Sequence, residues 1–88
     1  MYYVYVLLSE KDNKFYIGYT KNLEKRIQTH NKGLVPSTSF RQPLKLIFYE
    51  AHLYKKDALR REDYLKTSPG KKSLKFILRE FLKDLKFT

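Results

Sequence analysis

The sequence predicts an α+β domain, in which a small three-stranded antiparallel sheet has helices packed on it in the order β-β-α-β-α-α. Two observations predict this class. Residues 2–8 and 15–20 show the period of strands and are separated by a turn-forming stretch, which indicates a hairpin. Beyond that hairpin, segments of helical spacing surround one further strand-like run at residues 44–53, rich in β-branched and aromatic residues. We expect one small domain over residues 1–88.

The hairpin is predicted from its alternation and from its turn. Residues 2–8 (YYVYVLL) alternate aromatic and aliphatic side chains without a charge, which suits a strand covered on both faces. Residues 11–14 (KDNK) supply the turn. Gly18 lies inside the second strand, where a glycine indicates either a close approach to the backbone or a bulge. In the simplest register, one face of the hairpin carries Tyr3, Tyr5, Tyr16 and Gly18, and the other carries Val4, Val6 and Ile17.

A first helix is predicted over residues 23–32, with Asn22 as its N-cap and Gly33 as the residue that ends it. On a helical wheel, His30 falls on the apolar stripe of this helix and Arg26 falls beside that stripe. An arginine and a histidine four residues apart are therefore expected to face the sheet.

The second half of the chain begins with a loop. Residues 33–43 are rich in Gly, Pro, Ser and Thr, and the length of this loop favours a functional or mobile segment. A helix is predicted over residues 56–66, and Ser68 and Pro69 are predicted as the N-cap and first residue of a last amphipathic helix that continues to Leu85. The outer face of this last helix carries a basic stripe, which a solvated surface explains most simply, made of Lys75, Arg79 and Lys83.

The composition and net charge favour some partners and exclude some kinds of site. The 19 Lys and Arg residues exceed the nine Asp and Glu residues and give a formal net charge of +10, which favours a polyanionic partner, nucleic acid ahead of an anionic membrane. A soluble protein that is merely basic is the alternative. The absence of cysteine excludes a disulfide framework and a thiolate metal site. Because no basic signal region or apolar membrane span is evident, we expect a cytoplasmic protein without a membrane partner.

Glu62 is the most informative departure from a simple amphipathic pattern. It falls on the apolar stripe of its helix together with Ala58 and Leu65. An unpaired buried carboxylate is costly, so a cation should meet it. The cation could belong to a structural ion pair, with an arginine such as Arg26, or the carboxylate could have a metal-binding or catalytic role. The residue pattern alone leaves both interpretations open.

These residues together resemble a known family. The tripeptide YVY at residues 3–5, followed by YIG at residues 16–18, is similar to the paired tripeptides of the GIY-YIG endonucleases. Arg26 and His30 match the arginine and histidine of that family, and Glu62, in ALRREDYLK, matches its glutamate.

The resemblance covers nearly the whole chain, from about residue 2 to residue 83, in the order of elements found in the family. It departs from the family pattern at Tyr3, which stands where the eponymous glycine would be, whereas Tyr5 keeps the tyrosine. The likeness is closest to small stand-alone bacterial members and to the amino-terminal nuclease domain of the bacterial excinuclease.

The resemblance implies a divalent-metal-dependent endonuclease that hydrolyses phosphodiester bonds in DNA, selects its substrate by structure, and serves repair or recombination. One Mg²⁺ (or Mn²⁺) would be held by Glu62 and by phosphate oxygens. Tyr16 would deprotonate the attacking water, and Tyr5 would position that water or share the proton. Arg26 would bind the phosphate bidentately, and His30 would hold Tyr16 or a phosphate.

Two regions are predicted to contact the nucleic-acid strand. They are Thr38, Phe40 and Arg41 in the loop, and Lys71 and Lys72 near the last helix. Two other functions remain as alternatives: a non-catalytic module that binds nucleic acid with the same fold, and a small RNA-binding or ribosome-associated protein. The first is disfavoured because a binding module has no use for Glu62 in a phosphate cleft. The choice between DNA and RNA, a recruiting protein partner and the oligomeric state are left open.

Overall fold

The central strand of the sheet is β1, which lies between β2 and β3 and is antiparallel to both. The computed structural model describes residues 1–86. Its elements, in chain order, are β1 (Tyr2–Ser9), β2 (Phe15–Thr20), α1 (Leu23–Asn31), the short 3-10 turn η1 (Ser39–Arg41), β3 (Leu44–His52), α2 (Lys55–Leu65), α3 (Ser68–Ile77) and α4 (Arg79–Lys86). The predicted α+β class and its three-stranded antiparallel sheet are confirmed, with one more helix than predicted.

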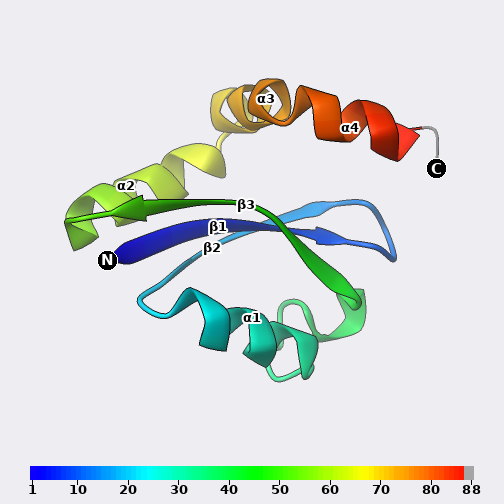
Figure 1. The fold of residues 1–88 in the computed structure, drawn as a ribbon, viewed down its shortest axis with the longest axis horizontal. Coiled ribbons are helices and arrows are strands. Elements are labelled where there is room, and N and C mark those ends of the chain that lie inside the picture. Colours follow the sequence, from blue (N-terminus) through cyan, green and yellow to red (C-terminus); the bar gives the residue numbers. More distant parts are fainter. Residues whose placement is uncertain (87–88) are drawn as a thin grey trace.

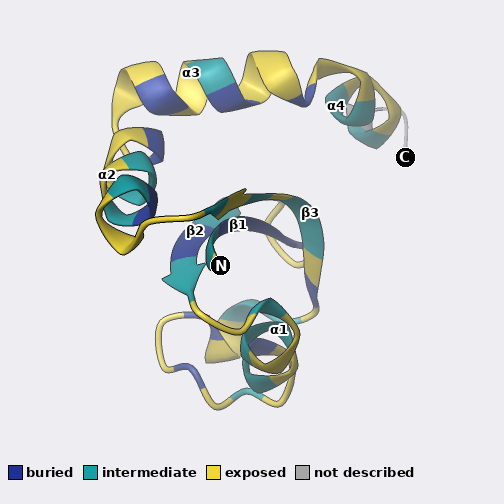
Figure 2. Cartoon of the chain, turned by 60° about the vertical axis from the view of Figure 1, so that its left-hand side comes forward, coloured by how far each residue is buried: buried dark blue, intermediate teal, exposed yellow. Residues whose placement is uncertain are grey.

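The sheet separates α1 on one side from α2, α3 and α4 on the other (Figure 1). Tyr5 pairs with Gly18 and Leu7 pairs with Tyr16, so the predicted division of the hairpin into two faces is confirmed. Each face buries its own small core, and β1 is buried on both sides (Figure 2). Toward α1 the buried residues are Tyr5, Leu7 and Leu44, and toward α2 and α3 they are Val4, Val6, Ile17, Ala58, Leu65, Leu74 and Leu78.

The loop over residues 33–43 is fastened to the turn between β1 and β2. The hydroxyl of Ser9 donates to the carbonyl of Arg41 at 2.6 Å, and the backbone amide of Glu10 donates to the carbonyl of Pro43 at 2.9 Å. The side chains of Arg41 and Asp12 form an ion pair at 3.4 Å. The loop is therefore held at its C-terminal end to the hairpin.

The ends of α1 follow the sequence prediction, whereas the start of α3 does not. Asn22 caps α1 by accepting from the amide of Lys25, and Gly33 follows with a positive φ of 73°. For α3, the N-cap predicted at Ser68 is wrong. Thr67 is the N-cap, because its hydroxyl oxygen accepts from the amide of Gly70 at 3.1 Å, and the helix begins one residue earlier.

The last predicted helix is two helices. The chain leaves helical geometry at Leu78, the C-cap of α3, and α4 starts at Arg79. Leu78 is 9% exposed and belongs to the same core cluster as Leu74, and Leu82 of α4 packs against it. The bend thus keeps the apolar face of α4 on the sheet. None of the helices in the described part of the chain is long and apolar enough to cross a bilayer.

Gly70 gives a test of the junction between α2 and α3. A Cβ at this position would overlap the backbone carbonyl oxygen of Tyr64, so the two helices would have to move apart. We expect Gly70→Ala to lower the free energy of unfolding by about 1–3 kcal/mol, as overpacking of a core does. Urea denaturation followed by circular dichroism measures it. Ser68→Ala, at an exposed position of the same turn, is the control and should change stability by less than about 0.5 kcal/mol. An unchanged midpoint for Gly70→Ala would contradict this packing.

Candidate active site

Tyr5 crosses the neighbouring strand β2 at Gly18. The two residues are direct partners in the sheet, and a Cβ on Gly18 would overlap the phenol ring and hydroxyl of Tyr5. The pairing of β1 with β2 is continuous from Tyr3 to Leu8, so Gly18 does not mark a bulge. The sequence left open whether this glycine marks a bulge or a close approach to the backbone. In the structure it allows the close approach of the Tyr5 ring. Because β2 is an edge strand, the Tyr5 hydroxyl reaches that edge.

The hydroxyl of Tyr5 belongs to a buried chain of hydrogen bonds. It lies 2.9 Å from Nε2 of His30, and Nδ1 of His30 lies 2.7 Å from the hydroxyl of Thr38. The Nε–H of Arg26 donates to the same Tyr5 hydroxyl at 3.2 Å. Tyr5, His30 and Thr38 are each 0% exposed. The predicted arginine and histidine of α1 therefore meet at Tyr5.

One assignment of the protons gives every donor in this series of hydrogen bonds an acceptor. Arg26 can only donate, so the Tyr5 oxygen accepts from it and the Tyr5 O–H donates to Nε2 of His30. Nδ1–H of His30 then donates to Thr38, whose hydroxyl donates to the carbonyl of Val35 at 3.5 Å. In the opposite order, the proton of Tyr5 would have no acceptor within residues 1–86.

His30 is neutral in this arrangement. Burial, and next the positive charge of Arg26, lower the pKa of His30 to about 4. Both ring nitrogens are occupied, one by Tyr5 and one by Thr38. With both ring nitrogens engaged, His30 makes no hydrogen bond to Tyr16 among the described residues, and the predicted contact with a phosphate stays a prediction. The ring instead meets Tyr16 edge-on, with centroids 5.1 Å apart and an interplanar angle of 64°.

Tyr16 and Arg26 form the more open part of the cluster. Both side chains are half-buried, whereas Tyr5 behind them is fully buried. The hydrogen bond to Tyr5 raises the pKa of Arg26, burial opposes this increase, and Tyr16 adds to it. Arg26 also borders a shallow hollow of about 200 Å³, whose other lining residues are Thr20, Asn22, Lys25 and Thr29. Because Tyr5 occupies Nε, the Nη groups of the guanidinium are left for Tyr16 and an anion.

Glu62 approaches the cluster from α2, on the other side of the sheet. Burial raises the pKa of the Tyr5 phenol, the hydrogen bond from Arg26 lowers it in part, and the charge of Glu62 adds to the increase. Glu62 is thus within electrostatic range of the phenol. Its side chain is 16% exposed, and Oε2 lies 3.2 Å from Nζ of Lys66, one turn further along α2. The predicted cation is present, but it is Lys66 and not Arg26.

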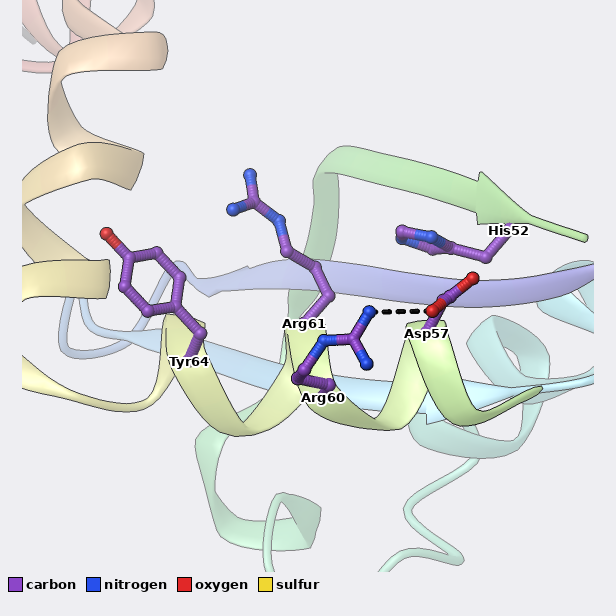
Figure 3. Close-up of a pocket in the computed structure, with 5 residues that line it drawn as sticks. All are labelled: His52, Asp57, Arg60, Arg61 and Tyr64. Atoms are coloured by element: carbon purple, nitrogen blue, oxygen red, sulfur yellow. Dashed lines mark hydrogen bonds and ion pairs between the residues drawn. The ribbon is translucent and has the colours of Figure 1, made fainter. Parts of the chain in front are cut away.

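The opposite edge of α2 is held by an ion pair that the sequence did not predict. Nε and Nη2 of Arg61 donate to the two carboxylate oxygens of Glu50 on β3, at 2.9 and 3.0 Å. Figure 3 shows Arg61 and Tyr64 extending from this side of α2, with Arg60 turned toward Asp57. A bidentate pair between a helix and a strand restricts rotation of the helix. It thereby helps to fix the orientation of the helix that carries Glu62.

The residues predicted to contact a nucleic-acid strand lie in very different surroundings. The Thr38 hydroxyl is buried against His30 and has no surface to offer a ligand. Arg41 is engaged by Asp12 and by the carbonyl of Phe15, at 3.4 Å in each case. Phe40 is 66% exposed, and Lys71 and Lys72 lie on the exposed surface of α3. Polar loop composition gave no sign that Thr38 would be buried.

The donor set limits which metal could bind. Among residues 1–86 there is no group of three or more His, Cys, Asp or Glu side chains that could enclose a metal ion. A structural zinc site requires such a group. Mg²⁺ commonly binds through one or two carboxylates, substrate phosphates and water. A single carboxylate at Glu62, paired with the exposed end of Lys66, fits that pattern.

The low pKa of His30 predicts how stability depends on pH. In the unfolded chain His30 takes up a proton near its ordinary pKa of 6.5, but in the folded state it does so only near 4. The unfolded state therefore binds more protons between these values, and stability falls as the pH is lowered through that interval, by about 3 kcal/mol in all. Urea denaturation at several pH values measures this change.

Two variants separate His30 from the other groups that titrate. His30→Gln cannot titrate in this range, so it should lose stability near neutral pH yet show a flatter pH dependence than the wild type. His52→Gln removes the other histidine, which lies partly exposed beside Glu50, and should keep the wild-type slope. An equally steep profile for His30→Gln would show that another group is responsible.

Comparison with known proteins identifies relatives of similar size. The UPF0213 protein of Staphylococcus haemolyticus is 43% identical over 77 residues, which cover 86% of this chain and 93% of that protein. The UPF0213 protein of Clostridium perfringens is 40% identical over 85 residues, which cover 96% and 90%. UPF0213 protein YazA of Bacillus subtilis is 43% identical over 68 residues, which cover 76% and 69%. No solved structure gives a significant match.

The family comparison covers the part of the chain that contains the cluster. The GIY-YIG catalytic domain matches residues 1–75, a span that contains Tyr5, Tyr16, Arg26, His30 and Glu62. This match extends over most of the chain, and the relatives match it along most of their own length. The chain therefore belongs to the GIY-YIG family.

Proposed function

We propose that this protein is a divalent-metal-dependent endonuclease that hydrolyses phosphodiester bonds in DNA and selects its substrate by structure. The observation that carries the proposal is the hydrogen bond from Arg26 to the buried phenol of Tyr5, with the carboxylate of Glu62, on the other side of the sheet, within electrostatic range of the same phenol. A cation for the phosphate and a carboxylate for a metal ion are two charges that stabilise the transition state of metal-assisted phosphodiester hydrolysis. The net charge of +10 supports a nucleic-acid substrate.

The roles divide according to burial. Tyr16 is half-buried, so it is the tyrosine that a water or a substrate can reach, and we assign to it the removal of the proton from the attacking water. Tyr5 is fully buried and is a positioning residue. Its hydroxyl fixes Nε of Arg26 and leaves the Nη groups to bind the phosphate as negative charge develops. His30 and Thr38 hold Tyr5 in that orientation.

The carboxylate of Glu62 would hold Mg²⁺ or Mn²⁺, with phosphate oxygens and water as the other ligands. The bound ion would polarise the scissile phosphate and stabilise the leaving oxygen. Lys66 occupies the carboxylate through an exposed side chain, an interaction that contributes little to stability. Glu62 can therefore release Lys66 and bind a metal ion at a small cost in free energy.

Substitution of Glu62 tests the catalytic proposal. Glu62→Gln keeps the size of the side chain but removes the charge, so cleavage of branched, flapped and duplex DNA with Mg²⁺ or Mn²⁺ should fall by on the order of 10²-fold or more. Binding of DNA measured without metal should persist. Asp63→Asn removes the same charge from the neighbouring, exposed position of α2 and is the matched control. If no substrate is cleaved with either metal while binding is intact, the protein is a non-catalytic nucleic-acid-binding module.

Two tyrosine variants test the division of roles. Tyr16→Phe should lower kcat by on the order of 10²-fold or more with little change in KM, because the phenol acts on the attacking water. Tyr5→Phe should raise KM as well as lower kcat, because Arg26 loses the group that orients it. Tyr19→Phe is the control, since the Tyr19 hydroxyl is buried without a hydrogen-bond partner in the described residues. Equal kinetic effects of Tyr16→Phe and Tyr5→Phe would contradict this division.

A further inference from the structure

The helices α3 and α4 lie on the side of the sheet opposite α1 (Figure 1). A second charged surface lies between these helices and the β1–β2 turn. Two adjoining hollows of about 620 and 340 Å³ form it, and they share Asn13, Lys75 and Leu82. We call this surface the basic groove. Its apolar side chains are Phe15, Leu82 and Leu85, and its cations are Lys14, Lys71, Lys75, Arg79 and Lys83. No carboxylate is among the described residues that line it.

The charges of the basic groove are less compensated than those on the other side of α2. There, Arg61 is paired with Glu50 at 2.9 Å and Arg60 with Asp57 at 2.6 Å. Of the five cations in the basic groove, Lys83 alone forms an ion pair within residues 1–86, with the exposed Glu80 at 3.3 Å. A concentration of positive charge with few counterions attracts a polyanion.

The spacing of these cations is unfavourable for the helices that carry them. Lys71 and Lys75 are four residues apart in α3, and Arg79 and Lys83 are four residues apart in α4. Like charges at this spacing are neighbours on a helix surface and repel each other. Arg79 is further held by its own neighbour, because its guanidinium lies over the ring of Phe76, 4.3 Å from the centroid. Repulsion between like charges at this spacing is relieved when a polyanion binds to them.

We propose that the basic groove binds a single-stranded segment of the nucleic acid whose cleavage was proposed above, an inference that rests on that function. One edge strand, β2, separates the groove from the candidate active site. Phe15, which lines the groove, and Tyr16, in the catalytic cluster, are neighbours on edge strand β2 and face opposite sides of the sheet. The apolar floor favours an unpaired strand, because its bases can pack on Phe15 and Leu82 while its phosphates meet the cations.

Binding of labelled oligonucleotides to the full chain tests this proposal. The probe is a fluorescent single strand of about 20 nucleotides, titrated in EDTA and followed by anisotropy, with a duplex of equal length beside it. The double variant Lys75→Ala with Arg79→Ala should weaken single-strand binding by about tenfold or more, and should weaken duplex binding less. The slope of log K against log salt should become shallower by about 1.4 for the single strand, as expected for two lost phosphate contacts.

The matched control is Lys55→Ala with Lys56→Ala, which removes the same charge from exposed positions of α2 outside the groove. It should keep most of the single-strand affinity. The exchange Lys75→Arg with Arg79→Lys should bind like the wild type, and circular dichroism melting checks that each variant is folded. Equal losses in the groove and control variants would overturn the proposal, because net charge alone would then explain binding. Displacement by polyglutamate as effective as displacement by unlabelled single strand would also overturn it, in favour of an acidic protein partner.

The outcomes distinguish this proposal from the proposed function. Because the titration contains no divalent metal, it does not depend on cleavage. If Glu62-dependent cleavage occurs but the groove variant binds like its control, the groove proposal fails and the nuclease stands. If the groove variant loses single-strand binding but the wild type cleaves no DNA, the nuclease proposal fails and the groove remains a nucleic-acid site.

Discussion

The buried hydroxyl of Tyr5 is the constraint on which both the fold and the candidate site depend. A phenol removed from water must find partners for its proton and for its oxygen, and leaving either unpaired costs about 1–3 kcal/mol. Tyr5 obtains both from α1, through His30 and Arg26 at four-residue spacing. These two bonds set the rotation and position of α1 against the sheet. They also require Gly18, since any side chain there would occupy the space of the Tyr5 ring.

The second half of the site depends on the other face of the sheet. Ala58 and Leu65 bury α2 against the strands, while Arg61 and Glu50 fix its far edge to β3. With the helix held in this way, the remaining position on its inner side is Glu62. A three-stranded sheet is narrow enough that groups from both faces can meet at its edge strand. The small size of the domain therefore allows one positive and one negative side chain, from opposite layers, both to influence the phenol of Tyr5.

The sequence predicted most of this arrangement because most of it is periodic. Strand alternation placed Tyr5 and Tyr16 on one face, and helical spacing placed Arg26 and His30 toward them. The features that it did not predict have no periodic signal. The helical spacing of apolar residues continues through Leu78, so it does not predict the bend between α3 and α4.

Other differences depend on contacts between segments far apart in the chain, or on local competition between neighbours. The ion pair of Arg61 with Glu50 joins residues 11 positions apart, and nothing in either segment indicates it. Lys66, in contrast, could have been predicted from the sequence, because a lysine four residues after Glu62 is a favourable helix pair. Thr67 and Ser68 are both good caps, so only the packing of Gly70 decides between them.

The balance of charge in the cluster leaves the guanidinium of Arg26 without a negative partner among the described residues. His30 is neutral, with its pKa lowered by burial and by Arg26, and Tyr5 is a neutral phenol whose pKa burial raises further. Glu62 is paired with Lys66, and no carboxylate lies within ion-pair distance of Arg26 in the described part of the chain. The guanidinium thus keeps an uncompensated charge in a half-buried position, held in place through Nε. A phosphate can supply the missing negative charge without displacing any bond that supports the fold. After burial, the charge of Arg26 is the second cause of the low pKa of His30, so under the proposed function a phosphate bound to Arg26 would favour proton uptake by His30.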